Sequence, residues 1–142
     1  ASPEYLAQHG RPQTPEALRV HRCLLGSHQN SRETWLYQQH HESRRVTVRG
    51  AFFSNQPGLL MKAALAGKGI VRLPSYLLLD ELSEGRLERL LRDYQTPVAS
   101  LFLVHPFEGH VPRRVRVMAD YVSEWFERRT QTLQTLEIHE TL

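Results

Sequence analysis

The chain has 142 residues, of which 40% are hydrophobic and 23% charged, ordinary values for a soluble globular protein of one domain or two small lobes. No apolar run approaches the roughly 20 residues that a membrane-spanning helix needs. The N-terminal sequence has neither the basic start nor the apolar stretch of a secretory signal. Because Cys23 is the single cysteine, an internal disulfide is excluded, and together these features favour the reducing cytoplasm.

The formal net charge of +3 raises the question of nucleic-acid binding. The basic residues are nearly all arginine, are scattered through the chain and often stand next to glutamate. Their densest clusters are pairs, at 44–45, 113–114 and 128–129. Since no long basic run with interleaved aromatic residues occurs, the charges indicate a solvated surface rather than a DNA-binding face.

The first third of the chain predicts a short helix followed by strands. Ser2 before Pro3 is a favourable helix start, and Gly10 ends this helix. Thr14 before Pro15 predicts a second capped turn. Apolar or alternating residues then predict strands at 22–27, 33–39 and 44–53, with alternation at Val46 and Val48 in the third. The polar segments 27–32 and 40–44 between them predict turns.

The middle of the chain changes quickly between helix and strand. A helix is predicted within 54–69, with Ser54 or Asn55 as its cap, Pro57 in its first turn and Gly67 at its end. Gly67 and Gly69 allow a tight reversal into a short strand at 70–73, which Pro74 stops. One or two helical turns follow at 75–85, and 86–94 fits either a helix or a strand.

The last third begins with an apolar segment, 98–106, which predicts a strand ended by Pro106. A helix follows, with Pro112 at its start and an amphipathic stripe. The stripe consists of Val111, Val115, Met118, Val122, Trp125 and Phe126. The threonine-rich tail after residue 130 lacks a strong stripe and is expected to fray.

Strands that alternate with helices predict an α/β fold with some parallel pairing, in which ligands bind at the carboxyl ends of strands. One such place is the segment "AFFSNQP", where a predicted strand ends near Phe53 and a helix starts within two residues. Ser54 and Asn55 then lie beside helical N–H groups that carry partial positive charge. The sequence therefore predicts a seat for a small carboxylate at this point.

A series of segments keeps its order and spacing along nearly the whole chain. It includes "VTVRG", "FFSNQPGLLMKAALAGKGIVRLPSYLL", "EGRLERLLRDY", "LFLVHP" and "VRVMADYVSEWFERR". From residue 1 to about 129, this series resembles the C-terminal half of a LysR-type transcriptional regulator. The resemblance implies a periplasmic-binding-protein-like (type 2) effector domain, in which a mixed sheet flanked by helices forms each of two lobes around a cleft.

The resemblance also implies a division of the chain. Residues 1–97 correspond to the second lobe, and 98–130 to the strand and helix that return to the first lobe, which is otherwise missing. Residues 131–142 form the tail, which we expect to be poorly ordered. Because the strand at 98–106 then lacks its partner strands, we expect the chain to self-associate.

The function implied is that of a cytoplasmic, ligand-sensing module, which is not an enzyme and uses no cofactor. A small, anionic effector binds between the lobes and modulates DNA binding by an N-terminal helix-turn-helix that this chain lacks. Its partners are the effector and further copies of itself, with DNA contacted only through the missing domain and no contact with membranes. Alternatives are a solute-binding receptor of the same fold and a small hydrolase that uses Cys23.

The resemblance implies that Phe53, Ser54 and Asn55 face the effector, and that the end of the next strand, near Pro74, points toward the cleft. Capping alone also explains Ser54 and Asn55. Arg72 either pairs with an effector carboxylate or lies on the surface. His105 either lines the cleft or makes a hinge hydrogen bond.

Other polar groups give weaker predictions. His40, His41 and Glu42 are adjacent, so in an extended segment they point to opposite sides and share one metal ion poorly. Cys23 and His21 can share one face of a strand, but the apolar run around Cys23 indicates a small core residue. The carboxylates fit an exposed helical face rather than a catalytic set: Glu84, Glu88 and Asp93. No metal ligand and no catalytic residue is therefore predicted.

Overall fold

The structure is a computed structural model that describes residues 1–26, 34–40, 42–96, 102–106 and 111–139, with side chains up to residue 132. The chain divides into two compact units, Ala1–Pro97 and Val98–Leu142. The division falls where we expected the second lobe to end. The assignment of the two units to lobes remains a prediction.

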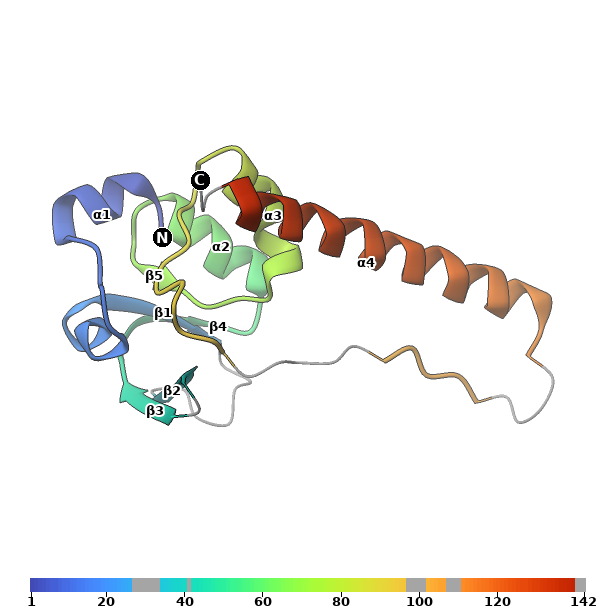
Figure 1. The fold of residues 1–142 in the computed structure, drawn as a ribbon, viewed down its shortest axis with the longest axis horizontal. Helices are drawn as coiled ribbons and strands as arrows, with labels where there is room; N and C mark the ends of the chain where they lie inside the picture. Colours follow the sequence, from blue (N-terminus) through green and yellow to red (C-terminus); the bar gives the residue numbers. More distant parts are fainter. Residues whose placement is uncertain (27–33, 41, 97–101, 107–110, 140–142) are drawn as a thin grey trace. The chain divides into compact units, whose positions relative to one another are not determined.

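Unit 1 consists of short helices and strands (Figure 1). In chain order these are α1 (Pro3–His9), the 3₁₀-helix η1 (Pro15–Val20), β1 (Arg22–Gly26), β2 (Thr34–Gln39), β3 (Glu42–Thr47), β4 (Arg49–Ser54), α2 (Pro57–Leu65), β5 (Ile70–Val71) and α3 (Ser75–Ser83). The described part of unit 2 contains α4 (Arg113–His139).

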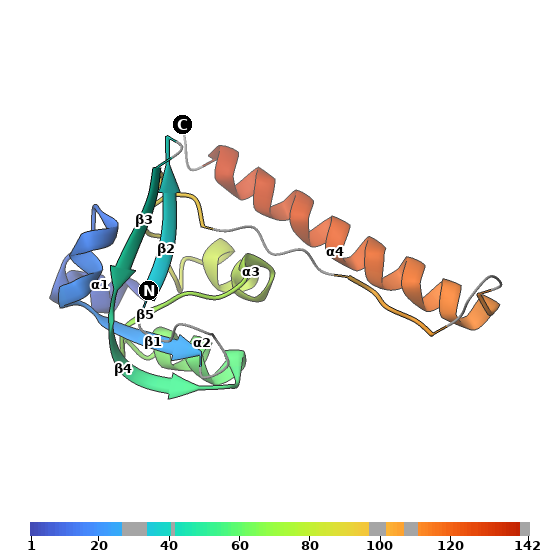
Figure 2. The same cartoon turned by 90° about the horizontal axis from the view of Figure 1, so that it is seen from below.

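The predicted parallel pairing is confirmed in a three-stranded sheet of order β4-β1-β5. β1 lies between β4 and β5 and runs parallel to both. In Figure 2 the arrows of β1 and β4 point the same way. β2 and β3 pair antiparallel as a separate hairpin. The α/β class with both kinds of pairing is therefore confirmed, although the two kinds lie in different sheets.

β1 is covered on both faces, because its side chains alternate between two apolar clusters. Cys23 and Leu25 belong to the first cluster, whereas Leu24 belongs to the second. The first cluster also contains Ala1, Tyr5, Leu6, Leu18, Trp35, Tyr37, Val46, Val48 and Ile70. The second also contains Leu60, Ala64 and Leu87. A strand buried on both faces has a continuous apolar sequence, which explains the run at 23–25.

The single strand predicted at 44–53 is in fact two strands, β3 and β4, separated at Val48. β3 pairs with β2 and β4 pairs with β1, so the chain passes from one sheet to the other at this residue. Val46 and Val48 both remain in the first cluster. Because the apolar alternation continues across the break, the sequence pattern contained no signal for it.

Three other segments differ from the prediction. Glu42 and Ser43 lie in β3 rather than in the predicted turn, and β5 ends at Val71 rather than at 73. Residues 86–94 form neither helix nor strand, since Leu91 has a φ of 55° that both regular structures exclude. Leu87 is nevertheless buried in the second cluster. The turn predicted at 27–32 lies outside the described residues.

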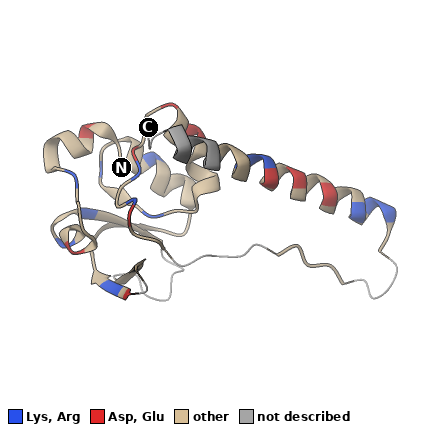
Figure 3. Cartoon of the chain, in the orientation of Figure 1, with Lys and Arg blue, Asp and Glu red and all other residues tan. Residues whose placement is uncertain are grey.

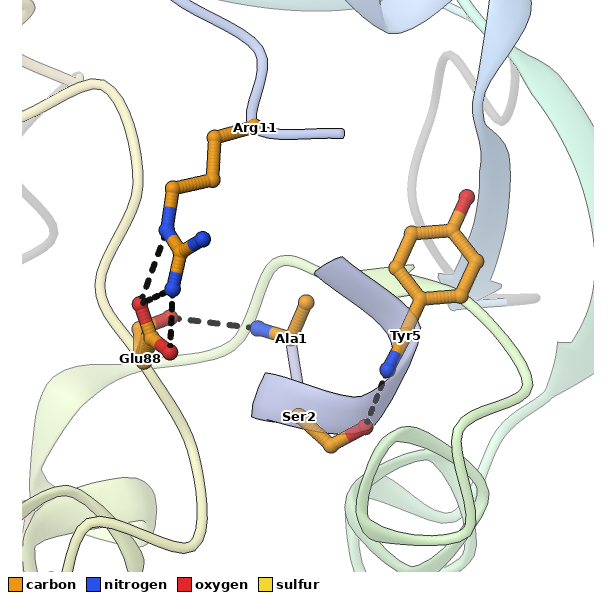
Figure 4. Close-up of polar contacts among 5 residues, drawn as sticks. All are labelled: Ala1, Ser2, Tyr5, Arg11 and Glu88. Atoms are coloured by element: carbon orange, nitrogen blue, oxygen red, sulfur yellow. Dashed lines mark hydrogen bonds and ion pairs between the residues drawn. The ribbon is translucent and has the colours of Figure 1, made fainter. Parts of the chain in front are cut away.

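Residues 86–94 are held to the start of the chain through Glu88 (Figure 4). The Arg11 guanidinium donates to the Glu88 carboxylate at 2.8, 2.9 and 3.2 Å. The Glu88 N–H also donates to the carbonyl oxygen of Ala1 at 2.8 Å. Beside it, Ser2 caps α1 as predicted, because its hydroxyl oxygen accepts a hydrogen bond from the Tyr5 N–H at 3.3 Å. The irregular segment is therefore placed by long-range contacts rather than by local structure.

Tyr5 connects α1 to the beginning of β1. Its hydroxyl oxygen accepts a hydrogen bond from the Arg22 N–H at 3.0 Å and lies 3.1 Å from Nδ1 of His21. The hydroxyl can therefore donate its hydrogen to Nδ1 when the His21 imidazole is neutral. His21 is buried, and this burial lowers the pKa of its imidazole, with a smaller contribution from the charge of His9.

We expect the protein to lose stability as the pH falls below the ordinary imidazole pKa of about 6.5. The His21 pKa is lower in the folded chain than in the unfolded chain, so acid protonates the unfolded chain first and favours unfolding. Urea unfolding at about pH 7.5 and about pH 5 measures this loss.

The matched variants are His21→Gln and His40→Asn. His21→Gln should reduce the difference in stability between the two pH values. His40→Asn should leave the difference unchanged, because His40 is an exposed turn residue whose φ of 48° is tolerated by asparagine. Equal differences in wild type and His21→Gln would contradict the assignment to His21.

Unit 2 contains the predicted C-terminal helix, α4, which begins directly after Pro112. Basic and acidic residues are interspersed along it (Figure 3), and Arg128 pairs with Glu124 at 2.9 Å. The helix continues to His139, whereas we expected it to give way to a fraying tail after residue 130. Within the described residues, α4 included, no helix combines the length and apolar character needed to cross a bilayer.

The segment 102–106 has no regular secondary structure, although a strand was predicted at 98–106. Phe102 and Val104 are 83% and 87% exposed, and no strand in the described part of the chain pairs with them. An apolar segment forms a strand only where a neighbour takes up its backbone hydrogen bonds. The prediction is therefore wrong for 102–105, and 98–101 lie outside the described residues.

Candidate functional site

The candidate site lies at the edge of the parallel sheet where β1, β4 and β5 end. The strand register places Gly26 opposite Ser54, and Leu24 opposite Val71. Ser54 is the last residue of β4, and Arg72 directly follows β5. Because β1 lies between these two strands, the predicted residues after β4 and after β5 flank its end, which is where ligands bind in open parallel sheets.

The segment 53–55 is open to solvent, as a ligand site requires. Phe53 is 47% exposed, Asn55 is exposed and Ser54 is half-buried. The position of the Phe53 ring depends on Gly50, because a Cβ atom on Gly50 would lie 2.3 Å from the ring and 3.0 Å from Leu25. Gly50 was missed in the sequence analysis, although a glycine inside a strand often marks such a close approach.

Ser54 and Asn55 do not cap α2, so that prediction is wrong. The N-cap residue is Gln56, whose side chain makes no capping hydrogen bond, while Pro57 occupies the first turn as predicted. The Ser54 hydroxyl oxygen instead accepts a hydrogen bond from the Gln56 N–H at 3.0 Å. Its hydroxyl hydrogen can therefore still be donated to an acceptor such as a carboxylate.

Arg72 is half-buried, and its guanidinium carbon lies 5.8 Å from the centroid of the Tyr37 ring. This distance is typical of a cation–π contact. Burial lowers the pKa of Arg72, whereas the electrostatic effect of Tyr37 raises it, and the guanidinium stays charged. Tyr37 was also missed, although its alternation with Trp35 in β2 indicated an inward-facing aromatic residue.

Arg72 is half-buried, whereas Arg45, which also pairs with no carboxylate of the described residues, is exposed. Arg11, Arg44 and Arg86 each form an ion pair with a glutamate. Among the residues that the structure describes, no carboxylate pairs with Arg72. A half-buried cation without a counter-ion is a favourable place for an anionic ligand.

The two remaining site predictions fall in different units. Pro74 is exposed at the start of α3, where its carbonyl oxygen accepts a hydrogen bond from the Leu77 N–H at 3.1 Å. His105 belongs to unit 2. The structure therefore places four of the predicted residues at or directly after the ends of β4 and β5: Phe53, Ser54, Asn55 and Arg72. The roles of all six remain predictions.

Comparison with known proteins decides the family. The family model described as LysR substrate binding domain matches residues 1–127. The chain belongs to the LysR substrate-binding domain family. The resemblance stated from the sequence is thereby confirmed, together with its periplasmic-binding-protein-like fold.

Relatives of this LysR substrate-binding domain are transcriptional regulators. The HTH-type transcriptional regulator CrgA of Neisseria meningitidis serogroup B is 33% identical over 125 residues, covering 87% of this chain and 42% of the regulator. An HTH-type transcriptional regulator of Haemophilus influenzae is 31% identical over 115 residues, covering 81% of this chain and 40% of its own length. The chain therefore spans about two-fifths of these relatives.

Solved structures agree with this assignment. The regulatory domain of AphB from Vibrio vulnificus has a TM-score of 0.71 and 28% identity, covering 88% of this chain and 62% of that domain. The regulatory domain of CrgA from Neisseria meningitidis has a TM-score of 0.58 and 37% identity, covering 68% and 47%. The chain thus corresponds to the regulatory, effector-binding part of LysR-type regulators.

Cys23 is a core residue of this LysR domain, as predicted. Its side chain is fully buried, and this burial raises the pKa of the thiol to about 12. The nearby His21 ring lies against the Tyr5 hydroxyl instead of the thiol. A thiol of this kind is a poor nucleophile, because the thiolate is the reactive form.

The other polar groups fit surface roles. Glu88 pairs with Arg11, and Glu84 pairs with Arg86. Among the described residues, no group of three histidine, cysteine or acidic side chains is placed to hold a metal ion. His41, part of the adjacent pair considered as a metal ligand, lies outside those residues.

Proposed function

We propose that this LysR substrate-binding domain senses a small effector that carries a carboxylate, bound at the carboxyl edge of the β4-β1-β5 sheet. The observation that carries the proposal is the half-buried guanidinium of Arg72, directly after β5, which pairs with no carboxylate of the described residues. Ser54, whose hydroxyl hydrogen can still be donated, ends β4 on the other side of β1. A guanidinium supplies a permanent charge and paired donors, and a hydroxyl adds one donor. The exposed Phe53 ring gives the remainder of the effector an apolar surface.

Sensing follows from a difference in affinity. An effector held between two lobes favours the arrangement in which both lobes contact it, and shifts the population toward that arrangement. A coupling of about 1–3 kcal/mol is typical of such a change. In the full-length regulator, the shift alters DNA binding by the helix-turn-helix domain. Asn55 and Pro74 complete the part of the effector site that unit 1 carries, and the role of His105, in unit 2, remains a prediction.

The protein acts in the cytoplasm and is a regulator rather than an enzyme. Support comes from the relatives, which are named as HTH-type transcriptional regulators. The alternative of a hydrolase that uses Cys23 is weakened by the buried thiol and its raised pKa. The other alternative is a transport receptor of the same fold. Each observation that fits this alternative fits a regulator equally well.

The expected result of a ligand screen is stabilisation by a small carboxylate but not by the amide with the same carbon skeleton. Thermal unfolding in the presence of such matched pairs measures this. Arg72→Gln should weaken binding at least tenfold, because a charge-assisted hydrogen bond contributes about 1.5–3 kcal/mol. Ser54→Ala should weaken it less.

Arg45→Gln is the matched control, since Arg45 is exposed on β3 and also loses one positive charge. Its binding should equal that of the wild type. If no carboxylate stabilises the chain, or if amides bind equally well, the proposal of an anionic effector is wrong.

We also infer that the chain self-associates. Phe102 and Val104 are almost fully exposed, and α4 exposes Val117, Met118 and Tyr121 to about 60%. Exposed apolar surface of this kind commonly marks a protein–protein contact. Light scattering after size-exclusion chromatography should give a mass above that of a monomer at high concentration, and a monomer throughout the range would contradict this.

A further inference from the structure

We propose that Tyr37 is a positioning residue of the effector site, whose ring holds the Arg72 guanidinium at the carboxyl edge of the sheet. The inference rests on the proposed function, since it explains how Arg72 is kept ready for a carboxylate. Arg72 follows a strand of two residues and has a long side chain, so its backbone alone does not orient its charge.

The geometry supports a fixed contact. In β5, Ile70 packs in the first core cluster, and Arg72 lies on the same side because side chains alternate along an extended chain. That side faces Tyr37, and the guanidinium carbon lies 5.8 Å from the ring centroid. The ring face attracts the cation without neutralising it, so the charge remains available to a ligand.

Tyr37 is itself held rigidly. It is 6% exposed, and its ring meets the Tyr94 ring edge-on, with centroids 6.4 Å apart and planes at 83°. The next residue, Gln38, exchanges two backbone hydrogen bonds with Gln95, at 2.7 and 2.8 Å. The ring is therefore fixed by core packing and by a backbone bridge, as a positioning residue requires.

The contact uses the ring rather than a phenolate. Burial raises the pKa of Tyr37 to about 12, so its hydroxyl is neutral at physiological pH. Removing the hydroxyl should therefore leave the contact intact, whereas removing the ring should abolish it. This difference separates positioning by the ring from an ion pair.

The experiment follows the Arg72 Nε–H signal by NMR in the ¹⁵N-arginine-labelled chain, with Arg72→Lys to assign the signal. In the wild type, the signal should be displaced by the Tyr37 ring current and should move further on titration with sodium acetate, relative to sodium chloride. Tyr37→Phe should behave like the wild type. Tyr37→Leu should lose the displacement and bind acetate about threefold or more weakly.

Tyr121→Leu is the matched control, because it also replaces a tyrosine by leucine, but at an exposed position of α4. The Arg72 Nε–H signal of this variant should equal that of the wild type. If Tyr37→Leu does not fold, nuclear Overhauser effects between the Tyr37 ring and the Arg72 side chain in the wild type decide instead. Their presence supports the contact and their absence overturns it.

The two hypotheses fail in different ways. If acetate moves the Arg72 signal equally in wild type and folded Tyr37→Leu, the site stands but the positioning role of Tyr37 is overturned. If the wild-type signal is displaced by the ring but does not respond to acetate, the contact stands while the proposed anionic effector at Arg72 fails.

Discussion

Gly69→Ala should lower the free energy of unfolding by about 3 kcal/mol or more, enough to unfold a marginally stable domain. Gly69 has a φ of 157°, in a region that side chains rarely adopt. A Cβ atom there would also lie 2.3 Å from the carbonyl oxygen of Arg22. That oxygen belongs to the backbone at the start of β1, which is paired with β4, so it cannot move without disturbing the sheet.

The consequence extends to the proposed effector site, because Gly69 directly precedes the two-residue strand that leads to Arg72. Urea unfolding followed by circular dichroism measures the loss. Gly58→Ala is the matched control, since Gly58 is inside α2 and its added Cβ atom would have no atom outside the adjoining helix backbone within 4 Å. It should be neutral or stabilise the protein by up to about 1 kcal/mol. A Gly69→Ala protein as stable as the wild type contradicts the clash.

Leu60→Ala should cost about 2–5 kcal/mol of stability, because it leaves a cavity between α2 and the sheet. Leu60 is 1% exposed and belongs to the second core cluster with Leu24, Ala64 and Leu87. It follows the Ser54 turn by six residues, so loosening α2 should also loosen the proposed effector site. Denaturant unfolding measures the first effect, and amide exchange at Gln56 and Gly58 measures the second.

The neighbouring residue provides the control. Leu59 lies in the same helix but is 44% exposed, so Leu59→Ala should change the stability by no more than about 0.5 kcal/mol. Equal losses in the two variants would mean that α2 does not pack against the sheet through Leu60.

The candidate site was partly predictable from the sequence. The end of the strand at Ser54 and the strand before Pro74 are indicated by the prolines and glycines next to them in the sequence. Parallel pairing then places the ends of both strands at the same edge of the sheet. Tyr37 and Gly50 were missed, because their roles depend on residues of other strands or on a close approach of a ring. No spacing along the chain indicates that a tyrosine of β2 meets an arginine after β5.

Local signals in the sequence were sufficient to determine α1, α2 and the doubly buried strand β1. The residues involved lie within about ten positions of each other: Ser2 and Gly10 bound α1, Pro57 and Gly67 bound α2, and the apolar run 23–25 marks β1. The order of similar segments along nearly the whole chain was also sufficient to indicate the LysR family.

Only the tertiary structure decided the break at Val48, the irregular path of 86–94 and the partner of Arg72. An apolar alternation is the same whether a strand remains in one sheet or passes to another, so Val46 and Val48 do not reveal the break. The Glu88 backbone is hydrogen-bonded to Ala1, and the Arg72 guanidinium lies over the Tyr37 ring. The two residues of each pair are far apart in sequence. Contacts of this kind depend on how the finished elements pack, which no local pattern encodes.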